Sequence, residues 1–390
     1  MDKQGIGCQI FGVVNFSTLL MEDIILENND GRLHQVRFFA QVAEKAGYTV
    51  AGVTTAYAMG GEEGLIAFAL IMLMFAWLKC HLVSLWDIEL HAGSLRFSLM
   101  LRMVSFGSMA YAVMIDSFFF LLIGALCSGL FVGLFWPSFY ILKEKSIGSW
   151  FVVEKSAGVI LILFTGILVM LINPFFILLG SFIASMLGVV LTYQFQKKTP
   201  SQRAVRIQTS QNRVQLRSIS FIDGFIGECV RMIRRLALLT GAVTLFQFNG
   251  VFSFALVLAI SEAVGALVKH FSRFEIKEFS AFLMAGCFIC AISTTFWLAG
   301  LILIGVGNAG MFPIIHEHVR ARVEHFDKHL REKNRFSGRI FGALIASYVF
   351  LEEIAGLYLF FLLTVLCLTQ WRVLDSSIRS TLIEPSRDIS

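Results

Sequence analysis

Long apolar stretches, separated by short polar connections, dominate the chain. A helix needs about 20 mostly apolar residues to cross the hydrocarbon core of a bilayer. The stretches lie at Gly64–Val83, Phe97–Ile115, Phe118–Leu142, Ala157–Leu171, Pro174–Phe195, two between about Ile226 and Phe271, Phe279–Thr294, Phe296–Ile315, Gly338–Leu351 and Ile354–Trp371. This pattern predicts an all-α, polytopic membrane protein with eleven clear transmembrane helices. A weaker candidate at 37–59, which contains Glu44-Lys45, would be the twelfth.

The distribution of basic residues tests this number of spans. If both termini are cytoplasmic and twelve spans alternate, the six external connections contain no Lys or Arg. All 32 Lys and Arg residues then lie in internal segments or just inside a helix on that side, as the positive-inside rule predicts. Without the first span, Lys3 and Arg32 would lie outside. The sequence therefore favours twelve spans, in a multi-pass protein of the plasma or inner membrane.

Polar segments divide the chain into two halves. We expect a cytosolic extension at 1–36, a six-helix half at 37–195, a second six-helix half at 221–372 and a cytosolic tail at 373–390. Between the halves, 196–220 contains several Lys and Arg and no Asp or Glu. This composition predicts a basic cytosolic linker that also favours contact with anionic membrane lipids.

Composition narrows the possible functions. Hydrophobic residues make up 57% of the 390 residues and charged residues 15%, with mean hydropathy +0.75, whereas soluble domains have about 25% charged residues. This excludes a disordered chain and argues against an ordinary soluble enzyme. The net charge of +5 is spread over short loops, so we expect no nucleic-acid partner. No Walker A motif is present, so we expect no ATP-driven activity.

The sequence predicts neither a metal nor another cofactor. Cys287 and Cys290 form a C-x-x-C inside an apolar run, where small apolar packing residues are the favoured interpretation. His318, His325 and His329 share one face of a predicted helix, but only the last two are close enough to bind one metal together. An intramembrane enzyme would need clustered nucleophiles, bases or metal ligands, and the spans carry no such motif. We therefore expect a protein that is not an enzyme.

An internal repeat relates the two halves. Span four ends in the sequence Gly129-Leu-Phe-Val-Gly133-Leu-Phe-Trp-Pro137, and span ten in Gly305-Val-Gly307-Asn-Ala-Gly310-Met-Phe-Pro313. The first glycine and the last proline are each 176 residues apart between the copies. Glycines allow helix backbones to approach closely, and proline ends or bends a helix. We expect these residues to shape the inner end of the bundle, either as gate elements or as packing alone.

With its six-plus-six topology, basic linker and Gly-rich ends of spans four and ten, the chain resembles the major facilitator superfamily over about residues 37–372. The signature loop of that family, G-x-x-x-D-R-x-G-R-R, has altered copies at Gly265–Arg273 and Asp87–Arg96. The resemblance implies two rigid halves that rock about a central cavity lined by spans one, four, seven and ten. It implies transport by alternating access.

Ionisable residues at membrane depth are the candidate site. A charge near the bilayer centre costs about 2.5–3.5 kcal/mol on insertion scales, so it needs a partner or a wet cavity. One interpretation is an anion site formed by Lys45, Arg234 and Arg235, with Glu44 or Glu262 carrying a coupling proton. Counted from Gly60 and Gly250, Lys45 and Arg235 would lie at the same depth.

Two other interpretations of these charges remain open. Glu262 could simply neutralise one of the arginines, or the arginines could extend towards lipid head groups. Arg102 in span three is interpreted as such an interfacial anchor.

Two functions from different classes fit these observations. The first is a secondary transporter that moves a small solute by alternating access, with an organic anion coupled to protons as the more specific hypothesis. Its partners would be the solute and membrane lipid. The alternative is a non-transporting receptor, scaffold or assembly protein on the same fold, which the altered signature loops favour.

The topology is testable by labelling. In a variant that lacks the native cysteines, single cysteines at Glu62 and Asp116 should react with an impermeant maleimide from outside. Cysteines at Arg203 and His325 should react only after permeabilisation. Labelling of positions 62 and 203 from the same side would contradict twelve alternating spans.

Overall fold

The computed structural model describes residues 29–86, 92–142, 148–193, 210–240, 250–271, 276–292, 296–322, 328–351 and 360–368. Within these ranges all regular secondary structure is helical, as expected for the all-α class. The described helices occur in the order that the apolar stretches predict, and they are consistent with twelve spans.

The weak first span is a continuous helical segment. It consists of α2 (Asn29–Ala43), a π-helix η2 (Glu44–Gly52) and the start of α3 (Val53–Trp86). Gly61, with φ 60° and ψ −148°, interrupts α3 and separates the first span from the second. Glycine is suited to this position because L-residues with a side chain are strained at positive φ. The helix starts at Asn29 rather than near Arg37, because hydropathy marks only the part of a helix that lies in hydrocarbon.

Short connections with turn-forming residues separate the other helices of the first half. These are α4 (Ala92–Ile115), α5 (Phe118–Leu142), α6 (Gly148–Leu171) and α7 (Pro174–Thr192). Asp116 adopts φ 51° between α4 and α5. Asn173 caps α7, since its side chain accepts a hydrogen bond from the Phe175 backbone N–H at 2.9 Å, and Pro174 occupies the first helical position, where its missing N–H costs nothing.

The second half contains α8 (Ser210–Leu239), α9 (Gly250–Phe271), α10 (Ile276–Ile292), α11 (Trp297–Arg322), α12 (Lys328–Leu351) and a helical segment at 360–368. Three of these helices include polar stretches of the sequence, and the linker expected at 196–220 stays a prediction. Helix α8 begins within the stretch expected to be a linker. Helices α11 and α12 extend into the polar stretch 316–337. Polar residues can continue a helix beyond the bilayer core because their side chains are solvated at the interface.

Several described helices are long and apolar enough to cross a membrane. By length and composition these are Gly93–Ile115, Phe118–Trp136, Pro174–Thr192 and the segment Arg32–Leu82, which contains the first two spans. Shorter apolar helices lie at Ser156–Leu171, Gly250–Val264 and Trp297–Asn308. Large apolar side chains face outward, including Leu171 at 74% exposure and Phe119 at 67%. Such a surface is expected where lipid replaces water.

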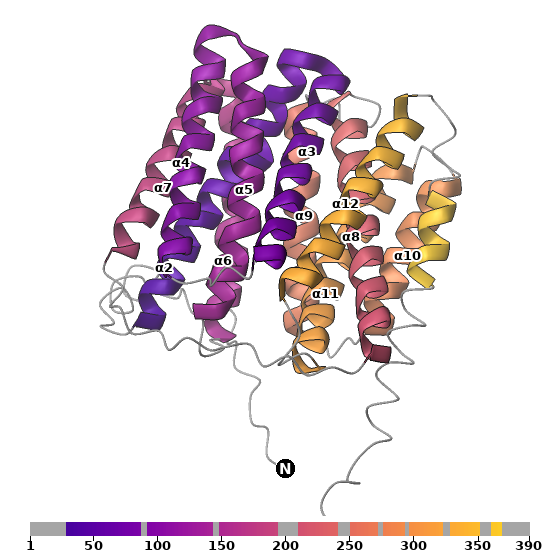
Figure 1. The fold of residues 1–390 in the computed structure, drawn as a ribbon. Coiled ribbons are helices and arrows are strands. Elements are labelled where there is room, and N and C mark those ends of the chain that lie inside the picture. Colours follow the sequence, from indigo (N-terminus) through magenta and orange to yellow (C-terminus); the bar gives the residue numbers. More distant parts are fainter. Residues whose placement is uncertain are drawn as a thin grey trace, which may run out of the picture.

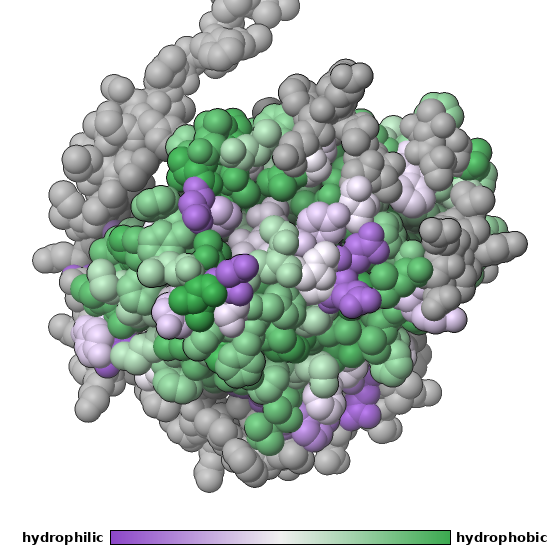
Figure 2. All heavy atoms as spheres, turned by 90° about the horizontal axis from the view of Figure 1, so that it is seen from above, coloured by the Kyte–Doolittle hydropathy of each residue, from purple (hydrophilic) through white to green (hydrophobic). Residues whose placement is uncertain are grey.

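The two halves lie side by side, with α2 to α7 on one side and α8 to α12 on the other (Figure 1). Within the first half, α5 packs against α3 and α4, and α4 packs against α7. Within the second, α8 packs against α12, and α11 packs against α9 and α10. The halves meet where α6 contacts α9 and where α3 contacts α12. Seen from above, the end of the bundle is largely hydrophobic with scattered hydrophilic residues (Figure 2).

The closest helix pair, α8 and α12, depends on glycine. A Cβ added at Gly224 would overlap the carbonyl oxygen of Arg335, and one added at Gly338 would overlap that of Phe221. Small residues let two backbones approach to this degree. The contact matters for function because it positions the charged residues of both helices.

We predict that Gly338→Ala destabilises the protein by about 1–3 kcal/mol, the usual cost of overpacking. The measurement is the temperature at which half of the detergent-purified protein loses its monodisperse elution peak. Gly180→Ala on α7 is the matched control, because a Cβ there meets nothing within 4 Å. Equal melting temperatures for the two variants would contradict this account of the α8–α12 contact.

Candidate functional site

The first span carries its charged residues on a π-helix. Segment η2 contains Glu44, Lys45 and Tyr48. π-Helical turns are rare and often occur at functional sites. Thr54 Oγ1 donates hydrogen bonds to the carbonyls of Val50 at 2.9 Å and Ala51 at 3.1 Å, near the end of this segment. The sequence predicted an ordinary helix here, since hydropathy does not report the hydrogen-bond register.

An ion pair joins the two halves. Lys45 Nζ on η2 contacts Glu262 Oε1 on α9, and both side chains are largely buried, with 24% and 16% exposure. Helix α6 covers the pair, because a Cβ at Gly158 would lie 3.9 Å from Glu262 Oε2 and 4.0 Å from Lys45 Cε. The structure thus brings together two residues that the sequence singled out. Glu262 forms an ion pair with this lysine.

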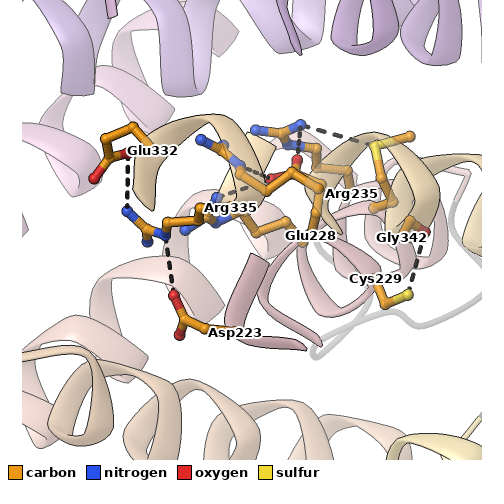
Figure 3. Close-up of polar contacts among 10 residues, drawn as sticks. Asp223, Glu228, Cys229, Arg235, Glu332, Arg335 and Gly342 are labelled. Carbon is orange, nitrogen blue, oxygen red and sulfur yellow. Dashed lines mark hydrogen bonds and ion pairs between the residues drawn. The ribbon is translucent and has the colours of Figure 1, made fainter. Parts of the chain in front are cut away.

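A second carboxylate, Glu228, organises the arginines of α8 and α12 (Figure 3). It has no exposed side-chain area, and its Oε2 accepts from Arg231 Nη1 and from Arg339 Nε, both at 2.8 Å. Arg235 Nη1 lies 3.7 Å from Oε1. Sequence reasoning missed Glu228 and Arg339. The spacing of Glu228 from Arg231 and Arg235, three and seven residues along one helix, places all three on one face and could have revealed the cluster.

A further ion pair extends the same contact. Arg335 Nε on α12 lies 3.0 Å from Asp223 Oδ2 on α8, and its Nη1 lies 3.9 Å from Glu332. The pairs Asp223–Arg335 and Glu228–Arg339 therefore lie along one helix interface (Figure 3). The glycines at this interface make both pairs possible, because they bring the two backbones together.

Arg234 and Arg235 differ in their partners. Arg235 is 7% exposed, which argues against an interfacial arginine that reaches lipid head groups. The charges acting on Arg234 come from Arg231, Arg235, Glu262 and Glu228. In the part of the chain that the structure describes, Arg234 forms no ion pair, and its buried Nε has no hydrogen-bond partner. Arg234 thus lies in range of both carboxylates while each is bonded to another cation.

Lys45 and Arg235 lie at different distances from the ends of their helices, and their equal depth in the membrane stays a prediction. Helix α8 ends at Leu239, and a Cβ at Gly250 would lie 2.9 Å from the Leu239 carbonyl oxygen. Arg235 is therefore four residues from the end of its helix, whereas Lys45 is fifteen residues from Gly60. The residues after Leu239 are themselves apolar, so hydropathy could not locate this end.

Tyr48 lies between the charges of the two halves. Its side chain is 6% exposed, and its ring stacks on Phe68 with centroids 5.2 Å apart. The charges acting on its hydroxyl come from Arg235, Glu228 and Arg339 in the second half and Arg102 in the first. The hydroxyl has no hydrogen-bond partner among the described residues. No sequence pattern distinguished this tyrosine.

Arg102 is not an interfacial anchor. It is 1% exposed and ranks among the largest fully buried side chains. The interpretation from sequence failed because α4 buries this face against α5, and hydropathy does not tell which side of a helix meets protein. The charge is therefore held inside the first half.

The repeated glycines lie at equivalent helix contacts in both halves. A Cβ at Gly129 would overlap the Met72 carbonyl of α3, and one at Gly305 would overlap Ser261 of α9. These contacts join span four to span two and span ten to span eight. The structure places the repeat glycines in helix packing, as one of the two interpretations expected.

The second glycine of each motif is similarly enclosed. A Cβ at Gly133 would lie 3.1 Å from the Ala76 carbonyl oxygen, and one at Gly310 would overlap the Phe279 ring. Neither proline ends its helix, because α5 continues past Pro137 and α11 past Pro313, and a bend at these prolines stays a prediction. Neighbouring helices can compensate for the hydrogen bond that proline removes.

The cavity that the described residues form beside Lys45 is too small for a solute. A cavity of about 10 Å³ lies between α2, η2 and α6, which is roughly enough for one water molecule. Its lining is Phe38, Gln41, Val42, Lys45, Ala157, Gly158 and Leu161. The described side chains also contain no group of three or more His, Cys, Asp or Glu that could hold a metal ion. His325 lies outside the described residues.

Comparison with known proteins identifies the fold. No family model and no curated protein sequence matches the chain. The human organic anion transporter MFSD10 has a TM-score of 0.62 at 14% identity, covering 89% of this chain and 100% of that one. A POT family transporter in complex with 5-aminolevulinic acid has a TM-score of 0.60 at 11% identity, covering 88% of this chain and 94% of that one. The E. coli fucose:proton symporter FucP has a TM-score of 0.55 at 14% identity, covering 87% of this chain and 97% of that one.

The chain has the fold of the major facilitator superfamily. This confirms the resemblance inferred from the repeat and the topology. Together with the apolar helices, it describes an integral, multi-pass membrane protein. On this superfamily fold, the contact of α8 with α12 joins spans seven and eleven, and the Lys45–Glu262 pair joins spans one and eight.

We predict that Glu228→Gln destabilises the protein by about 3–5 kcal/mol, because it leaves Arg231, Arg235 and Arg339 buried around a neutral amide. Thermal unfolding in detergent measures the effect. Glu332→Gln is the control, since that carboxylate makes one longer contact within α12 and should contribute about 0–1 kcal/mol. If Glu228→Gln melts with the parent protein, the carboxylate does not hold α8 and α12 together.

Proposed function

We propose that this protein is a secondary transporter that moves a small organic anion across the membrane by alternating access. The observation that carries the proposal is the excess of positive charge between the two halves. Glu228 neutralises one of three contacting arginines, Glu262 neutralises Lys45, and Arg234 has no ion-pair partner among the described residues. Such a site favours a negatively charged ligand.

Arginine suits this role chemically. Its planar guanidinium can hold a carboxylate or phosphate by two parallel hydrogen bonds, and it stays charged when buried. A desolvated cation between two repeats, near the middle of the membrane, is where transporters of repeat architecture bind substrate. Lys45, Arg234 and Arg235 are the residues that we propose for substrate binding.

The matching structures support the class of protein but not the substrate. They include transporters of organic anions, fucose and nucleosides, and a POT family transporter in complex with 5-aminolevulinic acid. The identities of 11–14% carry the fold only. The anion in the proposal therefore rests on the charges of this chain.

Transport requires the halves to separate around the site. A cavity that holds one water cannot admit a solute, so residues 37–195 would rock against 221–372, with 196–220 as a cytoplasmic linker and both termini in the cytoplasm. The Lys45–Glu262 pair spans the two halves and would break and re-form in each cycle. The enclosed glycines Gly133 and Gly310 would keep the helix contacts rigid within each half.

Proton coupling follows from the same pair. If Glu262 takes up a proton, Lys45 loses its counterion and is free to bind the anionic solute. Loss of the solute would restore the pair and release the proton. Glu44, next to Lys45 on η2, is the second candidate for the coupling proton.

We predict that Arg234→Gln in proteoliposomes lowers the affinity for an anionic solute about 10- to 100-fold, because a hydrogen bond to a charged group contributes about 1.5–3 kcal/mol. Uptake of a labelled carboxylate and of its uncharged amide measures the effect. Arg217→Gln, an exposed position on the same helix, is the matched control and should behave as the parent.

Two outcomes would contradict the proposal. Equal uptake of the carboxylate and the amide would exclude an anion site at Arg234. Absence of uptake of every solute, with no change in labelling between conditions, would favour the non-transporting receptor or scaffold instead.

A further inference from the structure

The first half contains a buried cation that the proposed site does not use. Arg102 on α4 is 1% exposed. Its guanidinium carbon lies 4.7 Å from the ring centre of Phe106 and 4.5 Å from that of Phe131. The aromatic faces hold the group by cation–π attraction, and they also keep water away from it.

A chain of hydrogen bonds fixes one edge of this guanidinium. Arg102 Nη1 donates to Ser128 Oγ at 3.2 Å, and Ser128 and Ser105 are hydrogen-bonded at 2.7 Å. Ser105 donates to the Gly124 carbonyl at 2.8 Å, so Ser128 must be the donor to Ser105. Since its lone proton is used in this way, Ser128 accepts from Arg102, and the orientation of the guanidinium is set.

The opposite edge is open. Nε and Nη2 of Arg102 are buried and have no hydrogen-bond partner in the described structure. These two nitrogens form the side of the guanidinium that binds both oxygens of a carboxylate or phosphate in parallel. Leaving such donors buried and unpaired is costly. This edge therefore has the geometry with which arginine binds a carboxylate or phosphate.

Tyr48 connects this guanidinium to the charges of the second half. The guanidinium carbon of Arg102 lies 5.9 Å from the Tyr48 ring centre, and the Tyr48 hydroxyl is a buried polar group without a partner among the described residues. The charges of Arg235 and Arg102 both act on that hydroxyl. Glu44 also acts on Arg102 but forms no ion pair with it in the described residues. Tyr48 thus contacts Arg102 of the first half and is also within range of Arg235, Arg339 and Glu228 of the second.

We propose that the transported solute carries two acidic groups, one held by Arg234 and Arg235 of the second half and the other by Arg102 and Tyr48 of the first. This inference rests on the proposed function and names its substrate class, an organic dianion. A dianion would contact both halves at once, whereas a monoanion would satisfy only one. Binding would also supply the partners that Arg102 and Tyr48 lack.

The test uses the purified full-length protein in liposomes and a series of matched probes. Succinate, glutarate and adipate are each compared with their monomethyl ester, which removes one charge and keeps the carbon chain. The parent protein should take up at least one dicarboxylate with a KM about 10- to 100-fold lower than that of its ester. This ratio is what the loss of one hydrogen bond to a charged group predicts.

Three variants locate the preference. Arg102→Gln should raise the KM of the dicarboxylate to that of the ester and leave the ester unchanged. Arg102→Lys keeps the charge without the two-pronged edge and should restore only part of the preference. Tyr48→Phe, which removes one hydroxyl, should raise the KM of the dicarboxylate about tenfold.

Arg96→Gln is the matched control on α4. Arg96 donates to the Thr192 carbonyl at 3.2 Å and lies over the Tyr193 ring, away from Tyr48. The Arg96→Gln variant should leave the ratio of the KM of the dicarboxylate to that of the ester unchanged. This result separates the loss of a specific contact at Arg102 from a general destabilisation of α4.

The outcomes distinguish this inference from the proposed function. The dianion inference is overturned if the parent protein takes up the dicarboxylate and its ester with the same KM. It is also overturned if Arg102→Gln and Tyr48→Phe reduce uptake of the dicarboxylate and of the ester equally. In both cases anion transport through Arg234 stands. If neither probe is taken up and Arg234→Gln has no effect, the proposed function fails and this inference with it.

Discussion

The burial of the Glu228 carboxylate between α8 and α12 is the constraint on which the second half depends. A carboxylate with no exposed area is stable in a membrane interior only with cations in contact, and Arg231, Arg235 and Arg339 supply them. These contacts require the two helix backbones to approach closely. Gly224, Gly338 and Gly342 are therefore needed for an electrostatic reason as well as for packing.

The same arginines outnumber the carboxylate that they contact, so positive charge is in excess within the second half. Glu228 is shared among several cations, and Glu262 is bonded to Lys45. The first half adds Arg102, which is held by aromatic rings and a serine pair. In the transport cycle that we propose, an anionic solute would balance this excess, and the Lys45–Glu262 pair would open to admit it. In this proposal, the residues that would bind the anion lie close to the contact that would open between the halves.

Packing within each half follows the internal repeat. Gly129 meets span two and Gly305 meets span eight, and Gly124 meets span three as Gly300 meets span nine. Each pair is separated by the same 176 residues in the sequence. Similar packing within each half results, and the Lys45–Glu262 ion pair lies between the two halves.

The sequence by itself determined the helices, their order and the repeat. The reason is that the thickness of the bilayer sets the length of each apolar stretch, and the orientation of the protein in the bilayer sets the placement of Lys and Arg. It also identified Lys45, Glu262, Arg234 and Arg235 as costly charges. Only the tertiary structure decided the partners: Glu262 with Lys45, and Glu228 with Arg339. It also showed that Arg102 and Tyr48 are buried close to each other. A hydropathy value averages over all residues of one helix. Ion pairing and burial of a side chain depend instead on which face of that helix contacts another helix distant in the sequence.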